Sequence, residues 1–238
     1  VFDALVRREY HAPDYAKLLL GNALVESGVV SNAHEFVKSR NIAEFEVRKA
    51  KNFIGDVSIF ETYSYLSEQL GWNSEQAHSY AEQEFAYDLH MILPKDEMVD
   101  IFNELILAGK QVTVASDTYY TKEQVALMLA KVGISVGFTL LVSSDLGKRK
   151  DNGQLWQHIK QSLPEGQSFI HVGDNAVADA QILGDFGLQN LHILNPLDKW
   201  HAAGWDNPFS GGNELSEQHI LKWGPLISSF GRFPFLGE

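Results

Sequence analysis

The chain has 238 residues, a formal net charge of −12, 45% hydrophobic residues and no cysteine. This length allows one large domain, or one domain with a smaller inserted one. The negative charge disfavours nucleic-acid binding. The lack of cysteine excludes disulfides and thiolate chemistry and fits the reducing cytoplasm. No segment has the ~20 apolar residues of a membrane span.

Up to about residue 95 the sequence is mainly typical of helices. Apolar side chains recur at helical spacing in residues 31–51 and 60–70, and Gly71 ends the pattern. Pro94 begins a further amphipathic stretch that ends at Gly109. We therefore expect the N-terminal region to be helical.

From residue 112 onward, short apolar runs alternate with helical patterns. The expected strands are 112–115, 138–142, 168–172 and 191–194, and the helices between them are 121–133, 154–161 and 178–184. This alternation predicts an α/β fold with a doubly wound, Rossmann-like parallel sheet. In such folds the chemistry lies just beyond the carboxyl ends of the strands.

From about residue 196 the periodic pattern is lost, and aromatic residues stand among glycines and prolines. We expect residues 196–238 to form a tail that packs back on the domain or leads into another one.

Polar residues follow the predicted strands at one edge of the sheet. They are Ser116 and Asp117, then Lys150, then Asp174 and Asp179. Each alone is equally typical of a turn, a helix cap or a solvated surface. Together, carboxylates suit Mg²⁺, while a hydroxyl and an ammonium suit phosphoryl oxygens. The set therefore predicts a phosphoryl-transfer site.

These segments resemble three motifs of the haloacid dehalogenase-like (HAD) superfamily. "VTVASDTYYTKEQV" resembles the second motif, with Ser116 as the phosphate-binding hydroxyl, and "SSDLGKRKDNGQ" resembles the third, with Lys150 as its lysine. "FIHVGDNAVAD" resembles the fourth, which implies that Asp174 binds the metal and that Asp179 supports the metal or the lysine. Asp117 and Asn175, which adjoin these motifs, are candidate substrate contacts.

The resemblance covers residues 1–195 and implies a domain organisation. The HAD core would comprise residues 1–10 and 93–195, with residues 11–92 inserted as a helical cap. It also implies Mg²⁺ as cofactor and a small phosphorylated molecule as substrate. The nine histidines show no HExxH pairing, so we assign no zinc site.

More narrowly, the chain resembles HAD-like proteins encoded with bacterial glycosyltransferases and polysaccharide-assembly genes, through "SRNIAEFEVRKA", "SIFETYSYL" and "WGPLISSFGRF". This implies a glycosyltransferase module, in the same or a neighbouring chain, as a partner. Arg40 and Arg48 lie two turns apart on one helical face with Glu44 between them. They would form either a clamp for an anionic or sugar group or a salt-bridge ladder.

The opening residues resemble the first HAD motif, which supplies a nucleophilic aspartate. In the alignment that we favour, Asp3 is the second aspartate and the nucleophile precedes Val1; in the other, Asp3 is the nucleophile and a metal ligand. We expect further residues before Val1, because the first strand would otherwise be cut short. Ala4 replaces the usual threonine, and the usual general acid is Phe2 or Leu5, depending on the alignment.

Three functions follow from these patterns. The first is a Mg²⁺-dependent phosphatase that acts through an aspartyl-phosphate, with a sugar phosphate of polysaccharide biosynthesis as the expected substrate. The second is a catalytically weak or inactive HAD module that scaffolds a glycosyltransferase or polysaccharide-assembly protein. Hydrolytic dehalogenation is disfavoured, because it needs no metal whereas the fourth motif is acidic.

Overall fold

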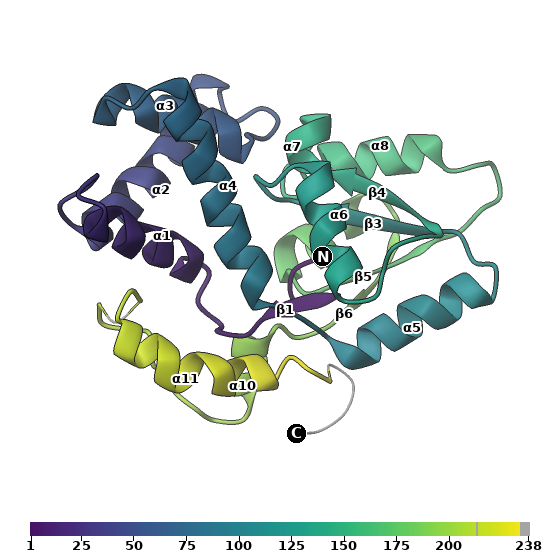
Figure 1. Cartoon of the computed structure of the whole chain (residues 1–238). Coiled ribbons are helices and arrows are strands. Elements are labelled where there is room, and N and C mark those ends of the chain that lie inside the picture. Colours follow the sequence, from purple (N-terminus) through teal and green to yellow (C-terminus); the bar gives the residue numbers. More distant parts are fainter. Residues whose placement is uncertain (213, 234–238) are drawn as a thin grey trace.

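The computed structural model describes residues 1–212 and 214–233, which form a group of helices beside an α/β part (Figure 1). The helical group lies within the segment predicted as the cap and consists of α1 (Tyr15–Glu26), α2 (Ala33–Ala50), α3 (Ile59–Leu70) and α4 (Ser74–Met91). These helices pack against one another. The expectation of a helical N-terminal region is confirmed.

Local sequence signals set the ends of the cap helices. Ser58 and Glu61 form a reciprocal capping box at the start of α3, and Asn73 and Gln76 form another at the start of α4. Gly71 ends α3 in the left-handed conformation, with a φ of 71°. The chain therefore turns sharply between α3 and α4, and the two helices pack side by side.

The α/β part contains two pairs of parallel strands. β3 (Val112–Ser116) pairs with β4 (Phe138–Val142), and β5 (Ile170–Gly173) pairs with β6 (Gln189–His192). The accompanying helices are α5 (Asp96–Leu107), α6 (Lys122–Lys131), α7 (Ser143–Leu146), α8 (Gln154–Ser162) and α9 (Ile182–Asp185), with a π-helical segment, Ala176–Gln181, before α9. These elements confirm the predicted α/β class and its parallel strands.

The strands in the described residues form three separate two-stranded sheets rather than one continuous sheet. The third sheet pairs β1 (Val6–Arg8) with β2 (Ile92–Pro94) in antiparallel fashion, where the chain leaves and re-enters the α/β part. Before β1, the amides of Leu5 and Val6 both donate to the carbonyl oxygen of Val1. Residues 1–5 therefore form a turn and supply no strand that joins β3 to β5.

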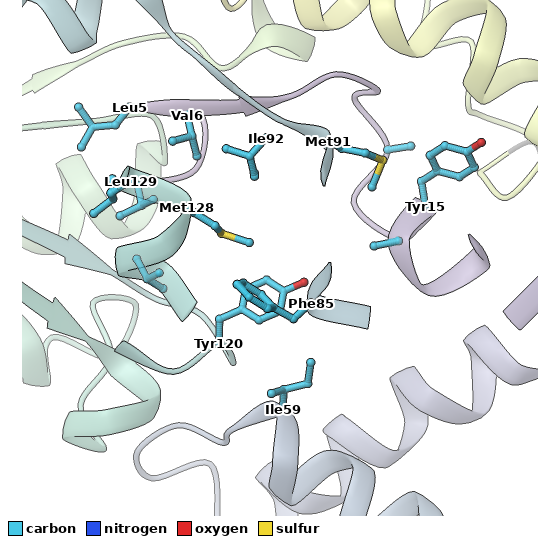
Figure 2. Close-up of a cluster of buried hydrophobic side chains, with 14 of the residues drawn as sticks. Leu5, Val6, Tyr15, Ile59, Phe85, Met91, Ile92, Tyr120, Met128 and Leu129 are labelled. Carbon is cyan, nitrogen blue, oxygen red and sulfur yellow. The ribbon is translucent and has the colours of Figure 1, made fainter. Parts of the chain in front are cut away.

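A hydrophobic cluster joins the cap to the α/β part (Figure 2). Tyr120, which follows β3, packs edge-to-face on Phe85 of α4 with 5.5 Å between ring centroids. Met128, Leu129 and Ile92 belong to the same buried cluster. Burial of such large apolar side chains is the main stabilising contribution in folding, so the two parts share one core.

The C-terminal region contains two helices, α10 (Pro196–Ala202) and α11 (Glu217–Ser229), where the sequence predicted only an irregular tail. Helix α11 packs beside the chain that leads out of β1: a Cβ on Gly224 would lie 3.1 Å from the Cα atom of Tyr10. The tail thus packs back on the domain. Residues 213 and 234–238 of the tail lie outside the described residues. No described helix is both long and apolar enough to cross a bilayer.

Candidate active site

A cavity of about 330 Å³ lies at the carboxyl ends of β3 and β5. Its wall is formed by residues 1–4, the end of β3, the loop before α8 and the segment after β5. Seven of the nine predicted site residues line it: Asp3, Ser116, Asp117, Lys150, Asp174, Asn175 and Asp179. Residues far apart in the sequence meet here because β3 and β5, although in separate sheets, both end at this cavity.

Lys150 is held by Asp179 at the base of this cavity. Its Nζ atom donates to Oδ1 of Asp179 at 2.6 Å, and both side chains are largely buried. The other carboxylate oxygen accepts the amide of Asn175 at 3.1 Å. Both oxygens of Asp179 are thus engaged by the protein. Of the two roles implied for Asp179, this geometry matches support of the lysine.

His171 was missed as a site residue by the sequence analysis. Its Nε2 atom lies 3.0 Å from the Asp179 oxygen that also binds Lys150. Its ring packs edge-to-face on Trp156 at 4.7 Å, and Trp156 donates to the carbonyl of Ala178 at 2.7 Å. Strand alternation could have identified it, since His171 lies two residues before Gly173 and so on the same face of β5.

The charges around Asp179 determine the protonation states. Burial would raise the pKa of Asp179, but the hydrogen bond from His171 and the charge of Lys150 hold it well below the usual range. Burial lowers the pKa of His171. Nε2–H of either form of the imidazole can donate to a carboxylate, so a single oxygen of Asp179 can accept from both Lys150 and His171.

Gly173 permits this arrangement by having no side chain. A Cβ atom on Gly173 would lie 2.5 Å from the carboxyl carbon of Asp179. That separation is far inside van der Waals contact, and the neighbour is a carboxylate already fixed by its partners. The glycine before Asp174 is therefore required for Asp179 to reach Lys150.

Asp117 and Asn175 bind backbone amides as well as lining the cavity. The Asp117 carboxylate accepts the amide of Lys150 at 2.8 and 3.0 Å and that of Asp151 at 3.4 Å. The Asn175 side chain accepts two amides of the π-helical segment. Both residues therefore order the loops that carry Lys150 and Asp179, whereas their predicted substrate contacts remain predictions.

Asp3 and Asp174 give the cavity a surplus of negative charge. Burial raises the pKa of Asp3, whose backbone has an unusual left-handed φ of 54°. Burial first, and then the charge of Asp3, raise the pKa of Asp174 to about 6. A carboxylate whose ionisation is disfavoured by burial and by a second carboxylate provides an environment that a divalent cation would stabilise.

The donor set fits Mg²⁺ with two protein carboxylates. Within the described residues no group of three or more His, Asp or Glu side chains is placed to hold a metal ion. The predicted ligand set of Asp3, Asp174 and Asp179 is thus not assembled as a trio, because Asp179 is taken up by Lys150 and His171. Mg²⁺ is commonly bound by only one or two carboxylates and retains waters, so a pair of carboxylates such as Asp3 and Asp174 is compatible with this ion.

Arg40 and Arg48 lie inside the cap and do not line the cavity. Arg40 is fully buried and makes two hydrogen bonds of 2.9 Å to Glu84 of α4. Both arginines also pair with Glu44, and Arg48 pairs with Asp56. The structure therefore shows the salt-bridge ladder, and these contacts leave neither guanidinium directed at the predicted phosphate-binding edge.

No family model and no curated protein matches the sequence. Among solved structures, the chain is similar to YfnB from Bacillus subtilis, described as an HAD-hydrolase bound to magnesium, at 13% identity and a TM-score of 0.51, over 86% of this chain and 97% of that one. It is also similar to the 2-haloacid dehalogenase of Pseudomonas syringae pv. Tomato DC3000, at 15% identity and a TM-score of 0.49, over 92% and 94% of the two chains.

At these identities the similarity concerns the fold. The chain has the α/β fold of HAD-superfamily hydrolases with a cap domain, as the motifs implied.

Proposed function

We propose that this chain is a Mg²⁺-dependent phosphoryl-transfer hydrolase that acts on a small phosphorylated metabolite. The observation that carries the proposal is the meeting of Ser116, Lys150 and Asp174 around one cavity, although they come from three separate stretches of the chain. A phosphoryl group needs hydroxyl and ammonium donors for its oxygens and carboxylates for an accompanying cation. All three kinds of group are present.

The side chains have distinct roles in this proposal. The Ser116 hydroxyl donates to a phosphoryl oxygen, and the Lys150 ammonium, oriented by Asp179, offsets the charge on the oxygens during transfer. Asp3 and Asp174 would hold Mg²⁺, which neutralises phosphoryl charge when bound. The similar YfnB structure is described as bound to magnesium, which supports Mg²⁺ as the cofactor.

The reaction would pass through an aspartyl-phosphate: an aspartate carboxylate attacks phosphorus as the bond to the substrate's alcohol oxygen breaks and the alcohol leaves, and water then releases phosphate and restores the carboxylate. Asp3 is the candidate nucleophile among the residues of this chain, in the alignment that makes it the first aspartate. The resemblance to polysaccharide-assembly proteins supports a sugar phosphate as substrate and a glycosyltransferase as partner.

A catalytically weak or inactive module is the second candidate. The observation in its favour is the local composition near Asp3, where Ala4 removes a hydroxyl and Phe2 or Leu5 replaces the usual acid. Without a general acid the departure of the leaving group would be slower, typically by ~10²–10⁴-fold. Such a module would bind Mg²⁺ and phosphate without rapid turnover.

Hydrolysis of an aryl phosphate tests the proposal. We expect turnover that requires Mg²⁺ and falls at least ~10²-fold in Lys150→Ala and Asp174→Asn, because each removes a group that faces the phosphoryl charge. Lys148→Ala is the matched control, since Lys148 lies outside the cavity and contacts His158. A protein that hydrolyses no compound in a broad panel of phosphates would contradict the proposal. If that inactive protein co-purified with a glycosyltransferase, the result would support the second candidate, a catalytically weak or inactive module.

A further inference from the structure

The loop that follows Ser116 is attached to the cap through three consecutive residues. Tyr119 and Tyr120 contact the cap directly, and Thr118 contacts it through Ser143 of α7. The amide of Thr118 donates to the hydroxyl of Ser143 at 2.9 Å. The carbonyl of Tyr119 accepts the amide of Ile59, at the start of α3, at 2.7 Å. The hydroxyl of Tyr120 donates to Asp88 of α4 at 2.9 Å. Residues 118–120 are therefore one of the places where the α/β part is attached to the cap.

The first of these attachments runs through a single hydroxyl. Ser143 is fully buried at the start of α7, and its Oγ atom lies 2.5 Å from Oδ2 of Asp56, in the segment between α2 and α3. A hydroxyl has one proton, so Ser143 donates to the Asp56 carboxylate and accepts from the Thr118 amide. The carboxylate thereby fixes the direction in which the hydroxyl points, and the hydroxyl fixes Thr118.

Asp56 is held in place from the cap side. It is 4% exposed, and its Oδ1 atom accepts both Arg48 and the amide of Val57. Arg48 also forms an ion pair with Glu44, and Glu44 forms a further ion pair with Arg40. The two arginines that the sequence analysis considered as a clamp thus belong to a network that ends at Ser143.

The same network reaches the loop a second time. The guanidinium of Arg40 lies 4.4 Å from the centre of the Tyr119 ring, and Arg40 is itself bound by Glu84. A charged group over an aromatic face contributes most where water is excluded, as it is at this buried arginine. Thr118 and Tyr119 are therefore positioned by one set of cap residues.

We infer that Asp56 is a positioning residue: through Ser143 and Thr118 it fixes the loop that follows Ser116 and thereby ties the cap to the phosphate-binding edge. Asp117 lies between the serine and the attached residues and binds the amide of Lys150. Displacement of the loop would thus disturb both groups that hold the phosphoryl oxygens. The expected effect on phosphate rests on the proposed function, whereas the attachment of the loop does not.

Hydrogen exchange and phosphate binding together test this inference. In Asp56→Asn and in Ser143→Ala, we expect the amides of Thr118 and Ile59 to exchange at least ~10-fold faster and inorganic phosphate, with Mg²⁺ present, to bind about 10-fold more weakly. Because each change eliminates the charge-assisted hydrogen bond between Ser143 and the Asp56 carboxylate, the double variant should be little worse than Ser143→Ala alone. Glu35→Gln is the control, since its pair with Lys38 is on the exposed face of α2.

Two results would overturn the inference. One is unchanged exchange at Thr118 in both variants; the other is additive effects of the two substitutions, which would mean that Asp56 does not act through Ser143. If Asp56→Asn fails to fold, Arg48→Lys, at a side chain that is 17% exposed, weakens the same carboxylate contact while retaining the charge. If the parent protein neither hydrolyses nor binds phosphate, the proposed function fails, but the exchange rates still decide the attachment.

Discussion

Lys150 and His171 share a single oxygen of Asp179, at 2.6 and 3.0 Å. The lysine brings charge to that oxygen, and the histidine brings a second polar contact from a ring that packs on Trp156. The carboxylate is consequently held from two directions. The position of the Lys150 ammonium therefore depends on a residue that does not itself need to touch a substrate.

Replacing His171 should impair the site without dismantling it. In His171→Leu we expect turnover of an aryl phosphate to fall by about tenfold, because a hydrogen bond to a charged group contributes about 1.5–3 kcal/mol. The affinity for Mg²⁺ should not change. Steady-state kinetics and Mg²⁺ titration measure both quantities, with His201→Gln at an exposed position as control. An unchanged turnover would show that Asp179 is held in place without His171, by Lys150 and the amide of Asn175.

Adding one methyl group at Gly173 should displace Asp179. Gly173→Ala places a Cβ 2.5 Å from the carboxyl carbon, so we expect a loss of about 1–3 kcal/mol in the free energy of unfolding, as in overpacked cores, together with loss of phosphate binding. Urea unfolding and phosphate titration provide the test. Gly184→Ala is the matched control, because nothing lies within 4 Å of its added Cβ. Equal stability of the two variants would contradict the expectation.

Mg²⁺ should stabilise the folded protein through Asp174. A ligand that binds only the folded state at 100 times its Kd stabilises it by about 2.7 kcal/mol, which raises the Tm. In Asp174→Asn this rise should be absent, whereas it should persist in Asp185→Asn, at an exposed position of α9. Thermal unfolding with and without Mg²⁺ measures the difference. The same rise in Asp174→Asn would exclude this carboxylate as a ligand.

His11 should make the fold sensitive to mild acid. Burial, with a further contribution from the charge of Arg8, lowers the pKa of His11 from 6.5 to about 4. The unfolded chain then binds a proton that the folded chain does not, so this stabilisation is complete above pH 6.5 and is lost as the pH falls towards 4. The difference amounts to about 3 kcal/mol.

Unfolding by urea between pH 4 and 7 measures this effect. His11→Gln should show a smaller decrease in stability over that range than the parent protein, because only the parent carries this titrating group. Parallel curves for the two proteins would mean that His11 is as accessible to protons in the folded chain as in the unfolded one.

The strand ends could be predicted from the sequence because each depends on local signals. The runs that end at Ser116 and Gly173 are short and apolar, and the parallel pairing of β3 and β5 with their neighbours follows from the alternation with helices. Lys150 and Asp179 were then expected at one edge. Their direct contact at 2.6 Å agrees with this expectation.

Other features depend on partners that are remote in the sequence. The spacing of Arg40 and Arg48 is the same for a clamp that binds an anion and for a salt-bridge ladder. The buried partner of Arg40 is Glu84, which lies 44 positions later in the sequence. Helix α11 contains Gly224 and Pro225, which locally disfavour a helix, and it forms against Tyr10 and His11. In both cases contacts with residues that are remote in the sequence determine the structure, and a single sequence does not show these contacts.

The pairing of β1 with β2 has a mechanical consequence. The two chain segments that connect the cap to the α/β part are hydrogen-bonded to each other from Val6–Pro94 to Arg8–Ile92, so they form one ribbon instead of two independent links. A rotation of the cap would have to bend this ribbon about a single axis. Ser228 of α11 donates to the carbonyl of Arg8 in the ribbon. The C-terminal helix is therefore hydrogen-bonded to the segment that a rotation of the cap would bend.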